Sequence, residues 1–114
     1  MTIQAGPELD RLIVEKVMGW SKALAKNGKD IGLFHNGTEN VWGFTFRPTV
    51  NLPQAFEVIA RLMFLGFFLT IKPRSEVAHC SVEDYDGLEL HHAKANTVPM
   101  AICLCAIAVV EGTP

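Results

Sequence analysis

Three histidines and one cysteine cluster in the last third of the sequence, and zinc binds both side-chain types. They are His79, Cys80, His91 and His92. On two neighbouring strands, His79 could lie beside one of the paired histidines. Consecutive strand residues point to opposite faces, so His91 and His92 cannot easily bind the same ion, and no C-x-x-C pair is present. We expect no metal site, and we keep a small metal-dependent hydrolase as one alternative.

Cys80 is also the candidate nucleophile, with Glu83 and Asp84 close to it in sequence. Its neighbour His79 is poorly placed to act as a base, because adjacent strand side chains diverge. The sequence contains no G-x-S-x-G, Walker or G-x-G-x-x-G motif. We therefore expect no catalytic residues and no cofactor, which indicates a protein that is not an enzyme.

An aromatic residue and several cations form a different kind of candidate site. Tryptophan can stack on a nucleobase, and arginine binds phosphate oxygens. Trp42 is followed by Arg47, while Lys72 and Arg74 fall at the end of a predicted strand. The expected ligand-binding residues are therefore Trp42, Arg47, Lys72 and Arg74. The structural alternative is that Trp42 packs at the edge of the core and the cations are solvated.

Composition indicates one domain that spans residues 1–114. The hydrophobic fraction of 49% is enough for a core without disulfides, and the three cysteines, an odd number, suggest reduced thiols. Ten basic and twelve acidic residues argue against a general nucleic-acid binder. No signal peptide is recognisable, and the C-terminal apolar run is shorter than the ~20 residues of a membrane span. We expect a cytoplasmic protein without nucleic-acid or membrane partners.

The uncharged run near the C-terminus predicts a buried helix. Residues 98–110 read VPMAICLCAIAVV, and Thr97 precedes them as a helix cap. A surface helix needs a polar side, so a helix without one must be covered on nearly every side. We expect Ile102 to be buried. We also expect Cys103 and Cys105 to react slowly, because apolar burial raises the pKa of a thiol.

A first helix is predicted to start at Pro7, a residue type favoured in the first helical turn. Gly6 would be its N-cap. The helix either ends at Gly19 or continues through residues 20–25.

A middle helix follows Asn51, which is a favourable N-cap, and Gln54 is placed to complete a capping box. Gly66 ends this helix. The apolar residues of one stripe along it are Leu52, Phe56, Ile59 and Met63.

Alternating hydrophobic residues predict the strands. Ile31–His35 and Val41–Phe46 flank a turn at Asn36 and Gly37, which indicates a hairpin or a long loop that packs aromatic residues on the core. The segments of a predicted antiparallel meander are Phe67–Lys72, Val77–Val82 and Leu88–His92. We expect an α/β (α+β) fold: a single layered α/β/α sandwich, with helices packed on an antiparallel sheet of three to five strands.

Parts of the sequence resemble a known family. Gly-x-Glu-Leu-Asp begins at Gly6, Val-Met-Gly-Trp covers Val17–Trp20, and Pro-x-Ala-Ile-Cys covers Pro99–Cys103. Together with the middle helix, NLPQAFEVIARL, these motifs resemble small tailed-phage proteins with the phage ABA sandwich domain. The resemblance covers about half of the chain and departs at Leu104 and Cys105, where relatives carry a basic residue and alanines. It implies an α/β/α layered domain and a phage or prophage origin, and it supplies no catalytic site.

These observations favour a non-enzymatic phage accessory protein in the host cytoplasm. Its expected role is counter-defence, in which the protein sequesters a nucleotide-type immune signal. The main alternative is a protein that binds a host or phage protein through an apolar patch. Assembly into a homo-oligomer is compatible with either role.

Overall fold

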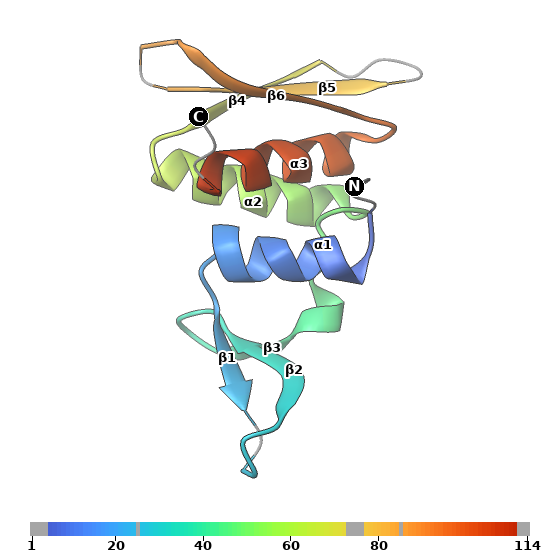
Figure 1. Cartoon of the computed structure of the whole chain (residues 1–114), viewed down its shortest axis with the longest axis vertical. Helices are drawn as coiled ribbons and strands as arrows, with labels where there is room; N and C mark the ends of the chain where they lie inside the picture. Colours follow the sequence, from blue (N-terminus) through green and yellow to red (C-terminus); the bar gives the residue numbers. More distant parts are fainter. Residues whose placement is uncertain (1–4, 25, 73–76, 85, 112–114) are drawn as a thin grey trace.

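The computed structural model describes residues 5–24, 26–72, 77–84 and 86–111. Its helices lie between two three-stranded sheets (Figure 1). The helices are α1 (Pro7–Leu12), α2 (Leu52–Phe64) and α3 (Val98–Val110), with a π-helical turn at Ile13–Val17 and a 3-10 turn at Gly43–Thr45. The strands are β1 (Ser21–Leu24), β2 (Asp30–His35), β3 (Asn40–Trp42), β4 (Phe68–Lys72), β5 (Ala78–Glu83) and β6 (Glu89–Ala95).

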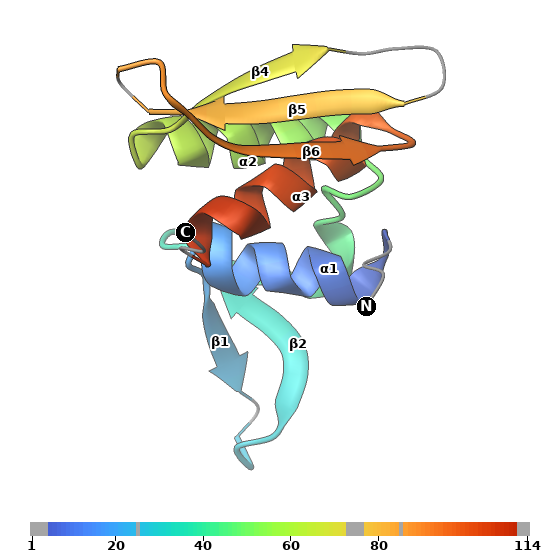
Figure 2. The ribbon, with the colours of Figure 1, turned by 45° about the horizontal axis from the view of Figure 1, so that its top comes forward.

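The predicted α+β class with antiparallel strands and a buried C-terminal helix is confirmed. The layers follow the order sheet β4–β5–β6, then α2 and α3, then α1, then sheet β1–β2–β3 (Figures 1 and 2). The expected α/β/α order would instead place a single sheet between helices. The difference arises because residues 21–24 form β1 and complete a second sheet.

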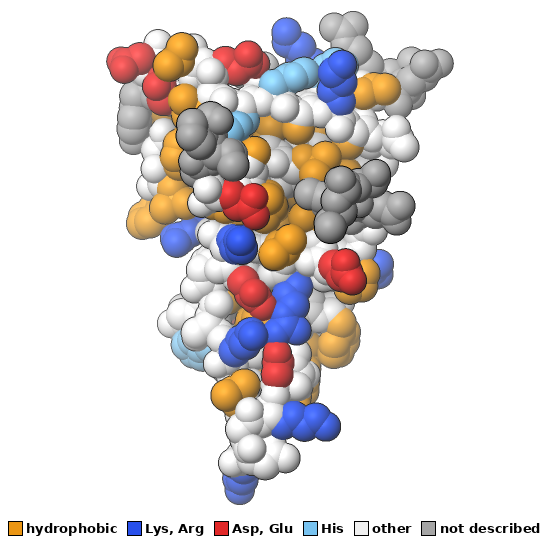
Figure 3. Space-filling model, viewed as in Figure 1, with side chains coloured by type: hydrophobic (Ala, Val, Ile, Leu, Met, Phe, Trp, Pro, Cys, Tyr) orange, Lys and Arg blue, Asp and Glu red, His pale blue; other side chains and the backbone are white. Residues whose placement is uncertain are grey.

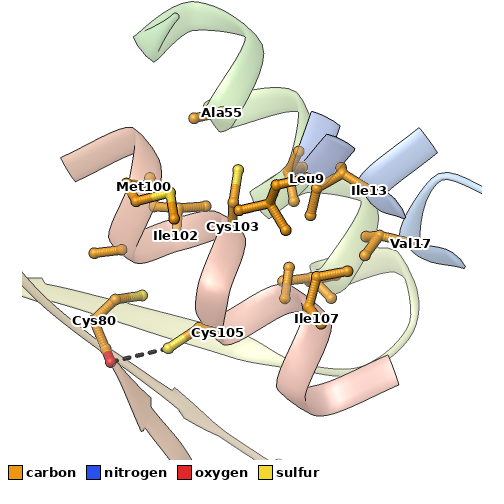
Figure 4. Packing of buried hydrophobic residues seen from close by; sticks show 14 of the residues in the cluster. Leu9, Ile13, Val17, Ala55, Cys80, Met100, Ile102, Cys103, Cys105 and Ile107 are labelled. Atoms are coloured by element: carbon orange, nitrogen blue, oxygen red, sulfur yellow. Dashed lines mark hydrogen bonds between the residues drawn. The ribbon is translucent and has the colours of Figure 1, made fainter. Parts of the chain in front are cut away.

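The centre of the core is α3, as its lack of charge predicts. Thr97 caps the helix, and its Oγ1 accepts a hydrogen bond of 3.3 Å from the backbone N–H of Met100. Ile102 and Cys103 are fully buried. The helix packs against β5, β6, α2 and the π-helical turn, so four elements cover it (Figure 4).

The three cysteines are free and fully buried. The Sγ atom of Cys105 donates a hydrogen bond of 3.0 Å to the carbonyl oxygen of Cys80 (Figure 4). Burial, and then the negative charge of Asp10, raise the pKa of the Cys103 thiol to about 12. The hydrogen bond to Cys80 and burial raise the pKa of Cys105 as well. Both thiols therefore lack the thiolate character that reactivity requires.

The predicted meander of β4, β5 and β6 is confirmed, and β6 turns its alanines rather than its leucine toward the core. Leu88 and Leu90 are exposed. The register between β6 and β5 decides which side chains of β6 point inward, because paired residues on neighbouring strands lie on the same face of a sheet. The inward pairs are Ala78 with Ala95, Cys80 with Ala93 and Val82 with His91. Small alanines at these positions suit the close approach of α3.

The first helix ends before Gly19, which adopts a φ of +69°. That left-handed conformation suits glycine and breaks the helix. The chain then forms β1, so the alternative of a helix through residues 20–25 is wrong. The hairpin interpretation of the next segment is confirmed by the pairing of β2 with β3. The second strand of this hairpin, β3, ends at Trp42 rather than at the predicted Phe46, because a 3-10 turn follows it.

Helix α2 begins at the predicted N-cap, where Asn51 Oδ1 accepts a hydrogen bond of 3.0 Å from Gln54 N–H. The Gln54 side chain does not return to Asn51 as a capping box requires. Its Oε1 accepts from the Arg47 N–H and its Nε2 donates to the Thr45 carbonyl oxygen. Asn51 thus caps the helix, while Gln54 holds the preceding loop.

The predicted stripe of α2 lies largely on the exposed side of the helix. Phe56 and Met63 are each 51% exposed. The buried residues of α2 are instead Ala55, Val58 and Leu62. Because α2 carries apolar residues on two faces, periodicity alone cannot decide which of them packs against α3.

The burial of α3 generates a stability prediction. We expect Ile102→Asp to prevent stable folding, because an unpaired buried carboxylate costs several kcal/mol against a total stability of about 5–15 kcal/mol. Circular dichroism melting measures the effect. Leu88→Asp is the matched control, since Leu88 is 63% exposed and should tolerate the charge. A cooperative Ile102→Asp melt near the parent temperature would contradict the buried position of α3.

The raised thiol pKa values generate a second prediction. We expect a polar maleimide to label Cys103 and Cys105 slowly in the native protein and rapidly in denaturant, with mass spectrometry as the measurement. Raising the pH should also lower the stability. An unfolded thiol ionises near pH ~8.5, whereas folded Cys103 holds its proton up to a pKa of about 12. This loss should be smaller in Cys103→Ala, and fast native labelling of both thiols would overturn their buried placement.

Candidate functional site

A pocket of about 480 Å³ lies between the first helix and the β1–β2–β3 sheet. One wall comes from α1 and the π-helical turn, and the other comes from β2 and the segment after β3. The lining residues are Pro7, Asp10, Arg11, Val14, Gly32, Phe34, Gly43, Phe44 and Arg47. A volume in this range suits a small-molecule ligand.

A buried carboxylate contributes to the pocket wall. Asp10 is only 4% exposed, and its Oδ1 accepts a hydrogen bond of 2.9 Å from the Thr49 N–H. Its Oδ2 is buried and makes no hydrogen bond with the described residues. Thr49 in turn accepts a hydrogen bond of 3.2 Å from the Gly6 N–H through its Oγ1. Asp10 thus ties the start of α1 to the loop before α2 and retains one oxygen for a further donor.

Two arginines line the pocket, and they differ in their partners. Arg11 binds Glu15 at 2.7 Å and also binds Asp30, and its guanidinium lies over the Phe34 ring at 5.6 Å. The hydrogen bond to Glu15 and then that to Asp30 raise the pKa of Arg11, and Arg11 lowers the pKa of Asp30. Figure 3 shows acidic and basic side chains interspersed over α1 and the sheet beneath it.

Arg47 is exposed and, within the described ranges, forms no ion pair. Its backbone is nevertheless fixed, because its N–H donates a hydrogen bond of 2.6 Å to Gln54 Oε1. An anchored backbone with an uncommitted guanidinium is well suited to bind an anion.

Aromatic side chains complete the pocket. Phe44 is 74% exposed, and its ring stacks on Trp42 with centroids 6.0 Å apart and planes at 26°. Gly43 lies between them in sequence. A Cβ atom at Gly43 would approach Cε2 of Phe34 to 2.9 Å, so a side chain there would displace a buried ring. Glycine at this position therefore lets the 3-10 turn pack closely on β2.

The structure brings together two of the four predicted ligand-binding residues. Arg47 lines the pocket, and Trp42 contacts the pocket residue Phe44. Lys72 ends β4 in the other sheet, on the far side of the helices (Figure 1). Arg74 lies outside the described residues.

The site residues predicted from sequence do not include Asp10, Arg11 or Phe44, which line the pocket. The preference for acidic residues near a helix N-terminus explains Asp10 without any binding site. One signal was present: Asp10 directly follows Leu9 and lies three residues before Ile13, which places an acid beside the apolar face of the helix. Nothing local marks Arg11 or Phe44, because their partners are distant in sequence.

The three histidines near Cys80 do not all lie on the same face of the β4–β5–β6 sheet as Cys80. His79 Nδ1 lies 3.3 Å from His92 Nε2 on the outer face, whereas Cys80 is buried beneath the sheet. His91 pairs with buried Val82 on the inner side. Within the part of the chain that the structure describes, no group of three or more His, Cys, Asp or Glu residues is placed to hold a metal ion.

The fold and pocket define a small α+β domain with a ligand-sized pocket. Residues 11–107 match the sequence model of the phage ABA sandwich domain, and the chain belongs to this family. The resemblance noted from the motifs is thereby confirmed.

The fold is also similar to that of a phage protein from Bacillus cereus whose crystal structure is known. The two chains are 20% identical and align with a TM-score of 0.66 over 97% of this chain and 93% of the other. At this identity the similarity concerns the fold. No curated protein has a detectably similar sequence. Within the described ranges, no helix has the length and hydrophobicity to cross a membrane.

Proposed function

We propose that this phage protein binds and sequesters a small anionic ligand of nucleotide type in the pocket beneath α1. The observation that carries the proposal is the combination of groups there: an exposed guanidinium and a buried carboxylate oxygen that have no partner among the described residues, and a stacked aromatic pair. A nucleotide offers a complement to each of these groups. Its phosphate carries negative charge, its base is planar, and most bases carry N–H donors.

Each group has a distinct role in this proposal. Arg47 binds the phosphate, because charge-assisted hydrogen bonds to phosphate are the strongest that arginine makes. Phe44, supported by Trp42, stacks on the base. Asp10 Oδ2 is covered in the unliganded protein, and in this proposal a small shift of the side chains around it opens it to the pocket, where it accepts a hydrogen bond from a base N–H. That bond satisfies an acceptor that has no donor among the described residues.

The pocket favours capture of a ligand over its chemical conversion. Among the residues that the structure describes, its lining supplies one carboxylate and two guanidinium groups and no thiol, hydroxyl or imidazole. Held in this way, an immune signal of the host would be kept from its effector. Counter-defence in the host cytoplasm is therefore the biological role that we propose for this member of a phage family.

A second candidate function is the binding of a host or phage protein through an apolar patch. The exposed apolar side chains of α2 favour it. The third alternative, a small metal-dependent hydrolase, has less support because Cys80 lies on the inner face of the sheet, whereas the paired His79 and His92 lie on its outer face.

Replacement of Arg47 tests the phosphate contact. We expect Arg47→Ala to weaken binding by about 1.5–3 kcal/mol, the usual worth of a hydrogen bond to a charged group. The melting temperature should change little, because the side chain is exposed. Calorimetric titration against cyclic nucleotides and ADP-ribose derivatives provides the measurement. Lys29→Ala is the matched control, since Lys29 is an exposed cation in the same half of the molecule but outside the pocket lining.

Two results would contradict the proposal. One is equal affinity of Arg47→Ala and Lys29→Ala for the ligand. The other is the absence of binding below millimolar concentration by every member of the panel, after which a pull-down from host lysate would test the second candidate function.

Asp10→Asn tests the unpaired carboxylate oxygen. The amide can retain its acceptor for the Thr49 N–H, while an NH₂ donor replaces the free oxygen. We expect binding to weaken by about 1–3 kcal/mol because a donor would then face the N–H of the base. The denaturation midpoint should be kept or raised, since a buried charge is removed. Unchanged affinity with an intact fold would remove Asp10 from the site.

A further inference from the structure

The outer face of α2 is apolar along its whole length. Pro53, Phe56, Ala60 and Met63 are all exposed, and they follow the alternating spacing of three and four residues that defines a helix-packing seam. Phe64, next to this row, is 79% exposed. Single exposed apolar residues are ordinary, whereas a continuous row marks an interaction surface.

Hydrophobic residues beyond α2 extend the same region. Leu65 and Phe68 follow the end of the helix and are exposed as well. Figure 3 shows hydrophobic side chains at the surface near the C-terminal end of α2. The opposite side of the helix is already used, since Ala55, Val58 and Leu62 are buried. A second helix can therefore pack on α2 without disturbing the core.

We propose that the outer face of α2 packs against the same face of a second copy of this chain, in an antiparallel dimer with a two-fold axis. When the two-fold axis crosses α2 at the height of residue 58, Phe56 lies opposite the partner's Ala60. The same axis places Met63 opposite the partner's Pro53, and Phe64 opposite the partner's Leu52. A large side chain thus meets the small Ala60 or the compact Pro53 at the two levels of the central row, and two apolar side chains meet at the level of Phe64. A two-fold interface requires such self-complementarity of a single surface.

The charges of α2 favour the same arrangement. Glu57 is exposed and forms no ion pair within the described residues. In the antiparallel dimer, Glu57 and the partner's Arg61 are offset by two residues, which is about 3 Å along the helix axis of α2. The guanidinium of Arg61 lies 5.3 Å from the centre of the Phe64 ring, and its Nε donates a hydrogen bond of 3.2 Å to the Val17 carbonyl oxygen. A parallel pair would instead place Glu57 level with the partner's Glu57.

The dimer and the ligand pocket are independent of each other. The pocket is lined by α1, β2 and the segment 43–47, and no residue of α2 lines it. Failure of ligand binding would therefore leave this inference intact.

Sedimentation velocity and light scattering on the whole chain test the dimer. At submillimolar concentration we expect twice the chain mass of 12.6 kDa. Ala60→Arg should halve that mass and leave the circular dichroism melt cooperative, because its side chain is exposed. Leu24→Arg, at an exposed leucine of β1 in the other sheet, is the matched control and should remain dimeric. A monomeric parent, or a dimeric Ala60→Arg protein, would overturn the proposal.

Disulfide trapping tests the orientation. Phe56→Cys and Ala60→Cys proteins are prepared separately, mixed and mildly oxidised. The antiparallel dimer predicts that the mixed disulfide forms in excess over either homodimeric disulfide. An excess of the Ala60→Cys homodimeric disulfide would indicate a parallel pair and overturn this arrangement. A monomeric parent whose α2 face instead becomes protected by a host protein would assign the face to a different partner.

Discussion

The constraint on which the fold depends is that α3 has no side that water can cover. A helix without polar side chains is stable only when other elements surround it. The sheet β4–β5–β6 covers one side, α2 another and the π-helical turn a third. The β6 strand directly precedes α3 in the chain, whereas α2 and the π-helical turn are distant from it in sequence. The burial of one helix therefore brings together elements from the whole chain and dictates the tertiary arrangement. Within the described residues, the buried polar side chains are consequently few, namely Asp10 and Thr49.

This arrangement explains which predictions from sequence succeeded. The burial of α3 follows from composition alone, and the start of α2 follows from the local capping chemistry of Asn51. The meander was predictable because its turns and alternating residues are close in sequence. In each case the information lies within a few residues of the feature, so no distant contact was needed to recognise it.

The errors have a common physical cause. Ser21–Leu24 shows no apolar alternation, and it becomes β1 only through pairing with β2. The alternating residues of β6 leave its inward face undecided, and the register with β5 sets it. For the site, Trp42 and Arg47 are near each other in the chain and were both proposed. Asp10 and Phe44 come to one pocket through tertiary packing, which a local pattern does not record.

The side chain of Gln54 has a consequence for the energetics of any ligand that reaches Arg47. Its two hydrogen bonds hold the backbone at Thr45 and Arg47 to the first turn of α2. Ordering a loop residue on binding costs about 1–2 kcal/mol of backbone conformational entropy. In this protein folding has already met that cost, so the rim of the pocket is preorganised. A side chain in the first turn of a helix thereby sets how rigid a neighbouring binding surface is.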